Sequence, residues 1–317
     1  MKKFAFAVLF ITAALSSFGQ PTSGKYKFVD ETVQKLGALS AFNVAVIADT
    51  ITAPFPGKEE KARAIFYWIA NNIALDPKAT KQNDPKNTLP EKVIELRKAT
   101  PLGFSLLLQE MCSAANIRCI SVDGYTRNYA EEINDPADEI NHAWNVVQLG
   151  QSPETWFLTD AARAGGFLDK KMTVFTKRFT SEYFFADKKL FNLSFFPKND
   201  AWQLGGGVKN LKEFYALPII SNAAFAAELS RISPLTGLIK TKLKNPVVFS
   251  FRVNNPVRSV TVITGEGKKQ SKPEDMNFEE KNGLLSFSYK FKQEDTTPLT
   301  ILVDGKEILQ YMAEVSE

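Results

Sequence analysis

The sequence predicts an α+β fold built as two successive parts. In the first part, apolar residues at helical spacing come before short strand-like segments, and beyond about Asn245 apolar and polar residues alternate as they do in antiparallel strands. The chain has 317 residues, which is enough for about two domains of roughly 150 residues each. Hydrophobic residues make up 44% of the chain and can form a core in both parts, which excludes a wholly disordered protein.

The first 19 residues, MKKFAFAVLFITAALSSFG, have the three parts of a secretory signal peptide. Two lysines precede an apolar run from Phe4 to Leu15, and small residues follow it. The run holds about 12 residues, whereas a membrane-spanning helix needs roughly 20, so a membrane anchor fits less well. We therefore predict cleavage near Gly19, a secreted or periplasmic protein, and no membrane span after cleavage.

Residues 20–205 read as helices followed by strands. Lys58–Asn72 carries apolar residues at spacings of three and four, which predicts an amphipathic helix. Residues 76–86 are polar and contain two prolines, which predicts a loop. Thr100 can cap a helix and Pro101 suits its first position, so a buried helix is expected to begin there.

Strand signals follow this buried helix. Ile117–Val122 is expected to form a strand that ends at the turn residues Asp123 and Gly124. His142–Leu149 and Thr155–Leu158, which a glycine and a proline separate, predict a hairpin.

The last part of the chain predicts a small all-β domain. Residues 206–244 carry helical segments and are expected to form a helical connector between the two domains. From residue 245 to residue 317, short alternating strands and the tight-turn pair Asp304 and Gly305 predict an immunoglobulin-like β-sandwich.

Composition excludes several classes of function. Without Lys2 and Lys3 of the leader, 37 basic residues (39 minus 2) face 35 acidic ones, so a net charge of +2 gives no support for nucleic-acid binding. One histidine and two cysteines exclude histidine-rich metal sites, zinc fingers and disulfide-rich scaffolds, and we expect no metal and no cofactor. Any cysteine-histidine chemistry must combine His142 with Cys112 or Cys119.

The first part contains, in order, the segments RKATPLGFSLLLQEMCSAANIRCISVDGYTRN, NHAWNVVQL, TWFLTDAARAGG and YFFADKKLFNLSFFPKNDAWQL. Over roughly residues 62–204, these segments resemble the transglutaminase-like superfamily, close to its kyphoscoliosis-peptidase branch. The resemblance implies a papain-like fold for residues 20–205 and a Cys-His-Asp triad, with His142 and Asp160 at the last two positions. In such a triad the helix dipole favours the cysteine thiolate, the histidine accepts its proton and the aspartate orients the imidazole.

Pro101 occupies the cysteine position of that triad. Proline has no thiol and no backbone N–H, so it supplies neither the nucleophile nor the oxyanion donor that the nucleophile's amide would give. Losing one such donor typically costs about 100- to 1,000-fold in turnover. Two further departures are Arg163, where the family usually carries tryptophan, and Phe195, where the branch often has histidine.

A substitute nucleophile is poorly placed. Cys112 lies eleven residues beyond Pro101, about 16 Å along a helix axis, and Ser105 points to the same side of the helix only approximately. Cys112 and Cys119 are most simply buried core cysteines, although a disulfide between them stays open in an oxidising compartment.

An aromatic cluster follows the triad segments, and its members either pack as core or form a binding surface. They are Phe179, Tyr183, Phe184, Phe185, Phe191, Phe195, Phe196 and Trp202.

The sequence thus predicts a secreted, catalytically inactive transglutaminase-like protein that binds or scaffolds envelope or extracellular polypeptide or glycan. One alternative is an active peptidase or acyltransferase of this family with an unrecognised nucleophile, and another is an interaction subunit for an active relative. Arg163 and His142 are expected to bind an anionic group, such as a peptide C-terminus or an acidic glycan. The alternative to an anion site is that Arg163 forms an ion pair with a nearby carboxylate such as Asp169.

Overall fold

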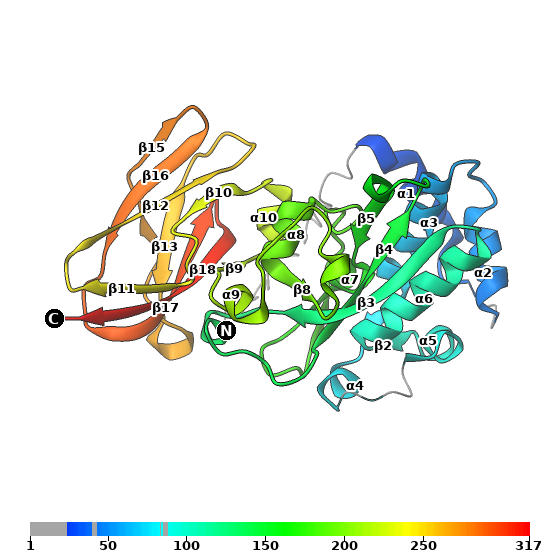
Figure 1. The fold of residues 1–317 in the computed structure, drawn as a ribbon, viewed down its shortest axis with the longest axis horizontal. Coiled ribbons are helices and arrows are strands. Elements are labelled where there is room, and N and C mark those ends of the chain that lie inside the picture. Colours follow the sequence, from blue (N-terminus) through cyan, green and yellow to red (C-terminus); the bar gives the residue numbers. More distant parts are fainter. Residues whose placement is uncertain (1–23, 40–42, 83, 85–87) are drawn as a thin grey trace, which may run out of the picture.

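The computed structural model describes residues 24–39, 43–82, 84 and 88–317, and the predicted signal peptide, residues 1–19, lies outside these ranges. The predicted α+β class is confirmed: helices gather at one end, a mixed region follows, and strands fill the other end (Figure 1). The helices of the first region are α1 (Lys27–Leu36), α2 (Val44–Thr52), α3 (Lys58–Asn72), α4 (Pro77–Gln82), α5 (Pro90–Leu96) and α6 (Pro101–Ala114).

A four-stranded antiparallel sheet in the order β5-β4-β3-β8 forms the centre of the first domain. Helix α6 lies along β3 and β4, and α2 and α3 pack against α6 in turn (Figure 1). These strands are β3 (Arg118–Thr126), β4 (His142–Gln148), β5 (Trp156–Thr159) and β8 (Phe195–Pro197).

Helix α6 begins where its sequence signals place it. The Thr100 hydroxyl accepts a hydrogen bond from Gly103 N–H at 3.2 Å, and Pro101 takes the first helical position. Leu107, Leu108 and Met111 are at most 1% exposed, so this helix is buried as predicted.

The loop prediction for residues 76–86 is wrong for its first part. Residues Pro77–Gln82 form helix α4, because Asp76 caps it by accepting a hydrogen bond from Ala79 N–H at 3.0 Å. Asp followed by proline is a helix start as well as a turn signal, since proline's fixed φ suits the first helical position.

The predicted strand end at Asp123 and Gly124 is also wrong. Strand β3 continues to Thr126, and Gly124 pairs with His142 on one side and Pro197 on the other. A Cβ at Gly124 would overlap the carbonyl oxygen of Phe196 and lie 2.5 Å from Cη2 of Trp144. This glycine therefore allows close packing within the sheet rather than a turn.

Several short elements accompany the central sheet. They are β1 (Ala74–Leu75) paired in parallel with β2 (Lys98–Ala99), α7 (Ala161–Gly165), the hairpin of β6 (Gly166–Leu168) and β7 (Phe175–Lys177), and α8 (Lys188–Ser194). In Figure 1, α7 and α8 lie between the helical region and the C-terminal sheets, whereas β2 lies beside the helices.

Two sheets form the C-terminal region, as expected for a β-sandwich, with largely antiparallel strands. The predicted turn is present, because Asp304 and Gly305 have φ of 49° and 74°, as a tight hairpin requires. One sheet contains β10 (Ser230–Ser233), β12 (Pro246–Arg252), β16 (Leu284–Lys290) and β15 (Phe278–Lys281). The other contains β11 (Leu238–Lys242), β18 (Lys306–Ser316), β17 (Asp295–Val303), β13 (Val260–Thr264) and β14 (Glu274–Asp275), with β9 (Ile219–Ile220) paired to β18.

Residues 206–244, predicted as a helical connector, are more mixed than that. They hold the short helices α9 (Leu211–Tyr215) and α10 (Asn222–Ala226), but also β9, β10 and β11, which pair with C-terminal strands. These strands are too short to show clear alternation in the sequence, since they have two to five residues each.

Arg127 ties this segment to the end of β3. Its guanidinium is buried and donates to the carbonyls of Leu217 at 2.6 Å, Leu193 at 3.2 Å and Pro218 at 3.3 Å. It also lies 4.4 Å from the ring centre of Phe214. Burial lowers the pKa of Arg127 to about 10, which reflects how little water reaches this charge.

Candidate functional site

His142 and Asp160 are brought together by neighbouring strands. His142 is the first residue of β4, and Asp160 directly follows β5, which pairs antiparallel with β4. The distance from His142 Nε2 to Asp160 Oδ2 is 2.6 Å, and the two residues are 8% and 1% exposed. A partly buried imidazole thus has the partner that it requires.

Asp160 has a second role at the start of α7. Its Oδ1 accepts a hydrogen bond from Arg163 N–H at 2.9 Å, which caps this short helix. One carboxylate oxygen therefore holds the helix and the other holds the imidazole, so the orientation of both is fixed.

The imidazole of His142 is packed among aromatic rings. Its centre lies 6.4 Å from the Trp144 ring, to which it is stacked, and 5.5 Å from the ring of Phe195. Because Nε2 is engaged by Asp160, only Nδ1 remains for exchanging a proton with a reacting group. In the described part of the chain, Nδ1 forms no hydrogen bond.

Pro101 lies at the start of α6, the helix that is hydrogen-bonded to β4. Ser105 Oγ donates to the carbonyl of Trp144 at 2.8 Å, and Asn145 Nδ2 donates to the carbonyl of Ser105 at 2.9 Å. The first turn of α6 therefore presents a pyrrolidine ring without a backbone donor at Pro101.

Ser105, the candidate for a substitute nucleophile, forms hydrogen bonds within the helix–sheet contact. The residue is 2% exposed, and its hydroxyl lies 2.6 Å from the Ser121 hydroxyl and donates to the Trp144 carbonyl of β4. These contacts make Ser105 a link between helix and sheet.

Arg163 is half-buried, and its side chain extends toward the end of β3. Its Nη2 donates to Thr126 Oγ1 at 2.7 Å, and its guanidinium lies 5.6 Å from the ring centre of Phe195. Within the described ranges it forms no ion pair with Asp169, whose carboxylate instead accepts hydrogen bonds from Thr173 and Val174. The remaining guanidinium donors are thus not committed to a carboxylate of the described chain.

Sequence reasoning missed the residues that support Arg163. Thr126 binds Arg163 through its hydroxyl, and its own backbone is held by Asn141, with N–H to Oδ1 at 2.9 Å and Nδ2 to carbonyl at 3.0 Å. Asn141 directly precedes His142 in the NHAWN segment, which was the one available signal.

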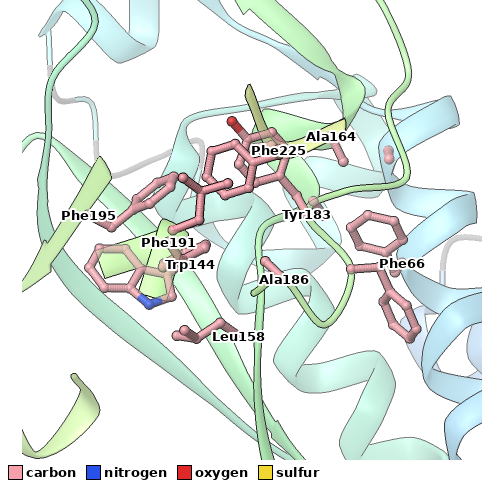
Figure 2. Packing of buried hydrophobic residues seen from close by; sticks show 14 of the residues in the cluster. Phe66, Trp144, Leu158, Ala164, Tyr183, Ala186, Phe191, Phe195 and Phe225 are labelled. Atoms are coloured by element: carbon pink, nitrogen blue, oxygen red, sulfur yellow. The ribbon is translucent and has the colours of Figure 1, made fainter. Parts of the chain in front are cut away.

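Most of the predicted aromatic cluster is core. Figure 2 shows Phe191, Phe195 and Tyr183 close to Trp144 and Phe225, and the Phe191 and Phe195 rings stack 3.9 Å apart. The buried members are Tyr183, Phe184, Phe191, Phe195 and Phe196, while Phe179, Phe185 and Trp202 are partly buried.

Both cysteines are free thiols. Cys112 is fully buried, and Cys119 accepts a hydrogen bond from Asn145 Nδ2 at 3.4 Å. Burial raises the pKa of Cys119 well above its ordinary value, which disfavours the thiolate that a nucleophile needs.

Among the residues that the structure describes, no three His, Cys, Asp or Glu side chains are grouped so as to hold a metal ion. No helix within the same residues is both long and apolar enough to cross a membrane.

A profile of the transglutaminase-like superfamily matches residues 45–161, which include Pro101, His142 and Asp160. The chain therefore carries a transglutaminase-like domain, as its sequence segments indicated.

The relatives of this domain include kyphoscoliosis peptidases, which confirms the branch. The protein from Mus musculus is 27% identical over 205 residues, which cover 62% of this chain and 31% of the relative. The protein from Homo sapiens is 28% identical over 183 residues, which cover 57% of this chain and 27% of the relative. This chain thus spans less than a third of the length of these two relatives. A solved structure described as "Crystal structure of a TGase" has 16% identity, covers 53% of this chain and 38% of its own, and has a TM-score of 0.30.

Proposed function

We propose that this chain is a catalytically inactive member of the transglutaminase-like superfamily that binds envelope or extracellular polypeptide or glycan. We further propose that it is secreted or periplasmic after cleavage near Gly19, and that the binding domain spans residues 20–205. The observation that carries the loss of activity is Pro101 at the first position of α6.

Two independent losses support inactivity. Pro101 supplies no thiol to attack a carbonyl carbon, and without an N–H it cannot stabilise the oxyanion that such an attack creates. Ser105 does not replace it, because its hydroxyl proton is committed to the Trp144 carbonyl in a buried contact. Desolvation raises the pKa of the Cys119 thiol, so Cys119 is a poor source of thiolate.

The binding role is supported by Arg163. Its guanidinium is partly exposed, is positioned by Thr126 and lacks a carboxylate partner in the described chain. A planar fork of donors suits a carboxylate or a similar anion. The predicted ligand is therefore an anionic group, such as a peptide C-terminus or an acidic glycan.

Activity is tested with the purified mature chain on a glutamine-containing peptide, with and without an amine donor. We expect neither hydrolysis nor crosslinking above the buffer rate, and at most feeble turnover for Pro101→Cys, because Arg163 remains. Turnover by wild type that His142→Ala abolishes, in a variant shown to be folded by its unfolding curve, would instead establish the enzyme.

Binding is tested by calorimetric titration with peptides that end in a free carboxylate or in an amide. We expect the carboxylate form to bind more tightly, and Arg163→Ala to weaken it by about 10-fold or more, as for a charge-assisted hydrogen bond. The matched control is Arg178→Ala, which removes an exposed guanidinium that lies over Phe167. Equal affinity in wild type and Arg163→Ala would refute the anion site.

A further inference from the structure

The first half of β3 has an open edge. Strand β4 pairs with β3 from Arg118 through Gly124, but on the opposite side β8 pairs only with residues 124–126. No strand within the described ranges pairs with the outer side of residues 118–123. An unpaired edge of this kind is a template for the addition of another strand.

Two contacts identify the backbone groups that face outward. Ser121 N–H donates to Gln109 Oε1 at 2.6 Å, and the Asp123 carbonyl accepts from Lys198 N–H at 2.9 Å. In this half of β3, the backbone N–H and carbonyl groups of the odd-numbered residues therefore point away from β4. The N–H and carbonyl of Cys119 and the carbonyl of Ser121 face the same way and have no hydrogen bond in the described chain.

Gln109 shows how this edge accepts a partner. Its side-chain amide has the chemistry of a peptide group and occupies the place that a carbonyl of an added strand would take at Ser121. Cys119 and Ser121 are both half-buried, so the edge is reachable from solvent.

A groove of about 490 Å³ runs beside the edge. Leu106 of α6, Pro90 of α5 and Ile117 before β3 give it an apolar lining. Gln109 and Glu110 contribute polar groups from α6. A strand added at β3 would hold alternate side chains over this groove.

The rim of the groove is acidic. Glu110 is exposed there, and Glu91 lies near enough for the like charges of the two carboxylates to act on each other. Arg118 also lines the groove, but its guanidinium extends across the sheet, away from the outer edge of β3: it donates to Gln148 of β4 at 3.1 Å and lies 5.1 Å from the Trp156 ring of β5. An apolar lining with an acidic rim suits an aliphatic stem that ends in a cation.

We propose that the open edge of β3 binds an extended polypeptide, which adds a strand to the sheet and places a lysine or arginine side chain in the groove. Main-chain hydrogen bonds supply affinity in this mode, and the groove supplies the preference for a basic residue. The partner strand displaces the Gln109 amide from Ser121. This site does not include Arg163 or His142, so the result of its test does not depend on whether the anion site exists.

The test uses the blocked peptide acetyl-TVKVT-amide, with acetyl-TVEVT-amide and a backbone N-methylated TVKVT as comparisons. Calorimetry measures affinity, and NMR hydrogen exchange reports protection of the Cys119 and Ser121 amides. We expect TVKVT to bind and protect both amides, TVEVT to bind more weakly, and the N-methylated peptide to lose binding. Equal binding of the N-methylated peptide, or protection confined to other residues, would overturn the proposal.

Two variants sharpen the result. Gln109→Ala leaves the Ser121 N–H unpaired and should strengthen TVKVT binding about 2- to 10-fold, whereas an unchanged affinity would contradict strand addition at this edge. Glu110→Gln should remove the preference for TVKVT over TVEVT. The matched control is Glu279→Gln, a charge removal on strand β15 of the C-terminal region, which should alter neither affinity.

Discussion

The buried ion pair between Asp30 on α1 and Arg63 on α3 should stabilise the packing of α1 against α3. Arg63 Nε and Nη2 donate to the two carboxylate oxygens at 2.8 and 2.7 Å, and the side chains are 0% and 3% exposed. Aromatic rings surround the guanidinium with their centres 4.9 to 5.7 Å away, and they belong to Tyr26, Phe66, Phe179 and Phe184.

Breaking this pair from either side should cost about 3–5 kcal/mol of unfolding free energy, because a buried charge is left without its counter-charge. Within the described residues, Nη1 of Arg63 forms no hydrogen bond and Asp30 is the ion-pair partner of Arg63, so Asp30→Leu would leave the guanidinium without an ion pair there. Arg63→Met would leave the carboxylate equally unpaired. The double variant replaces both charges by apolar groups among aromatic rings and should lie within about 1 kcal/mol of wild type.

Urea unfolding of wild type, both single variants and the double variant measures this coupling. Additive behaviour would put the double variant about 6–10 kcal/mol below wild type, the sum of the two single costs. That result, or single costs below about 1 kcal/mol, would show that the charge pair does not hold α1. The control is Glu31→Gln, which breaks the exposed Lys27–Glu31 contact of 3.8 Å on the same helix and should cost less than about 1 kcal/mol.

Two more predictions concern packing and pH. Gly124→Ala should lower the free energy of unfolding in urea by about 1–3 kcal/mol or more, because the added Cβ would meet the backbone of Phe196. The control is Gly24→Ala, where a Cβ meets nothing within 4 Å and the free energy of unfolding should change little. Equal costs for the two variants would contradict this reasoning. Burial raises the pKa of Glu182 above 4.5, so its favourable contribution is complete below that pH and is lost as pH rises through the folded-state pKa. The melting temperature of Glu182→Gln relative to wild type should therefore rise with pH above about 4.5, and a constant difference would refute the reasoning.

The predictable parts of the fold are those with local signals. Thr100 and Pro101 mark the start of α6 because a cap and a first-turn proline act within one helical turn. The strands on either side of Asp304 and Gly305 alternate over seven or more residues, and both turn residues adopt positive φ.

The errors arise where one residue type serves two purposes. Gly124 was interpreted as a turn residue, but it is needed because Trp144 and Phe196 approach its backbone from other strands. Asp76 before a proline was interpreted as part of a loop, although the same pair starts α4. Sequence alone does not show which neighbours will be packed against such a residue.

At the candidate site, His142 and Asp160 were located by their resemblance to a family pattern, and their contact spans only 18 residues. The partner of Arg163 could not be located in this way, because Thr126 is 37 residues away and a single polar contact leaves no periodic pattern in the sequence. The same holds for Asp30 and Arg63, which are 33 residues apart.

The contact between His142 and Asp160 does not by itself argue for catalysis. Asp160 caps α7, and His142 is buried, with its ring stacked on Trp144 and tilted against Phe195, so either residue has a structural role without catalysis. Replacing His142 by alanine would therefore alter stability in an inert protein as well as in an enzyme. For this reason Pro101→Cys is measured beside it, because this variant adds a thiol and an N–H at the start of α6 without removing any contact of the His142–Asp160 pair.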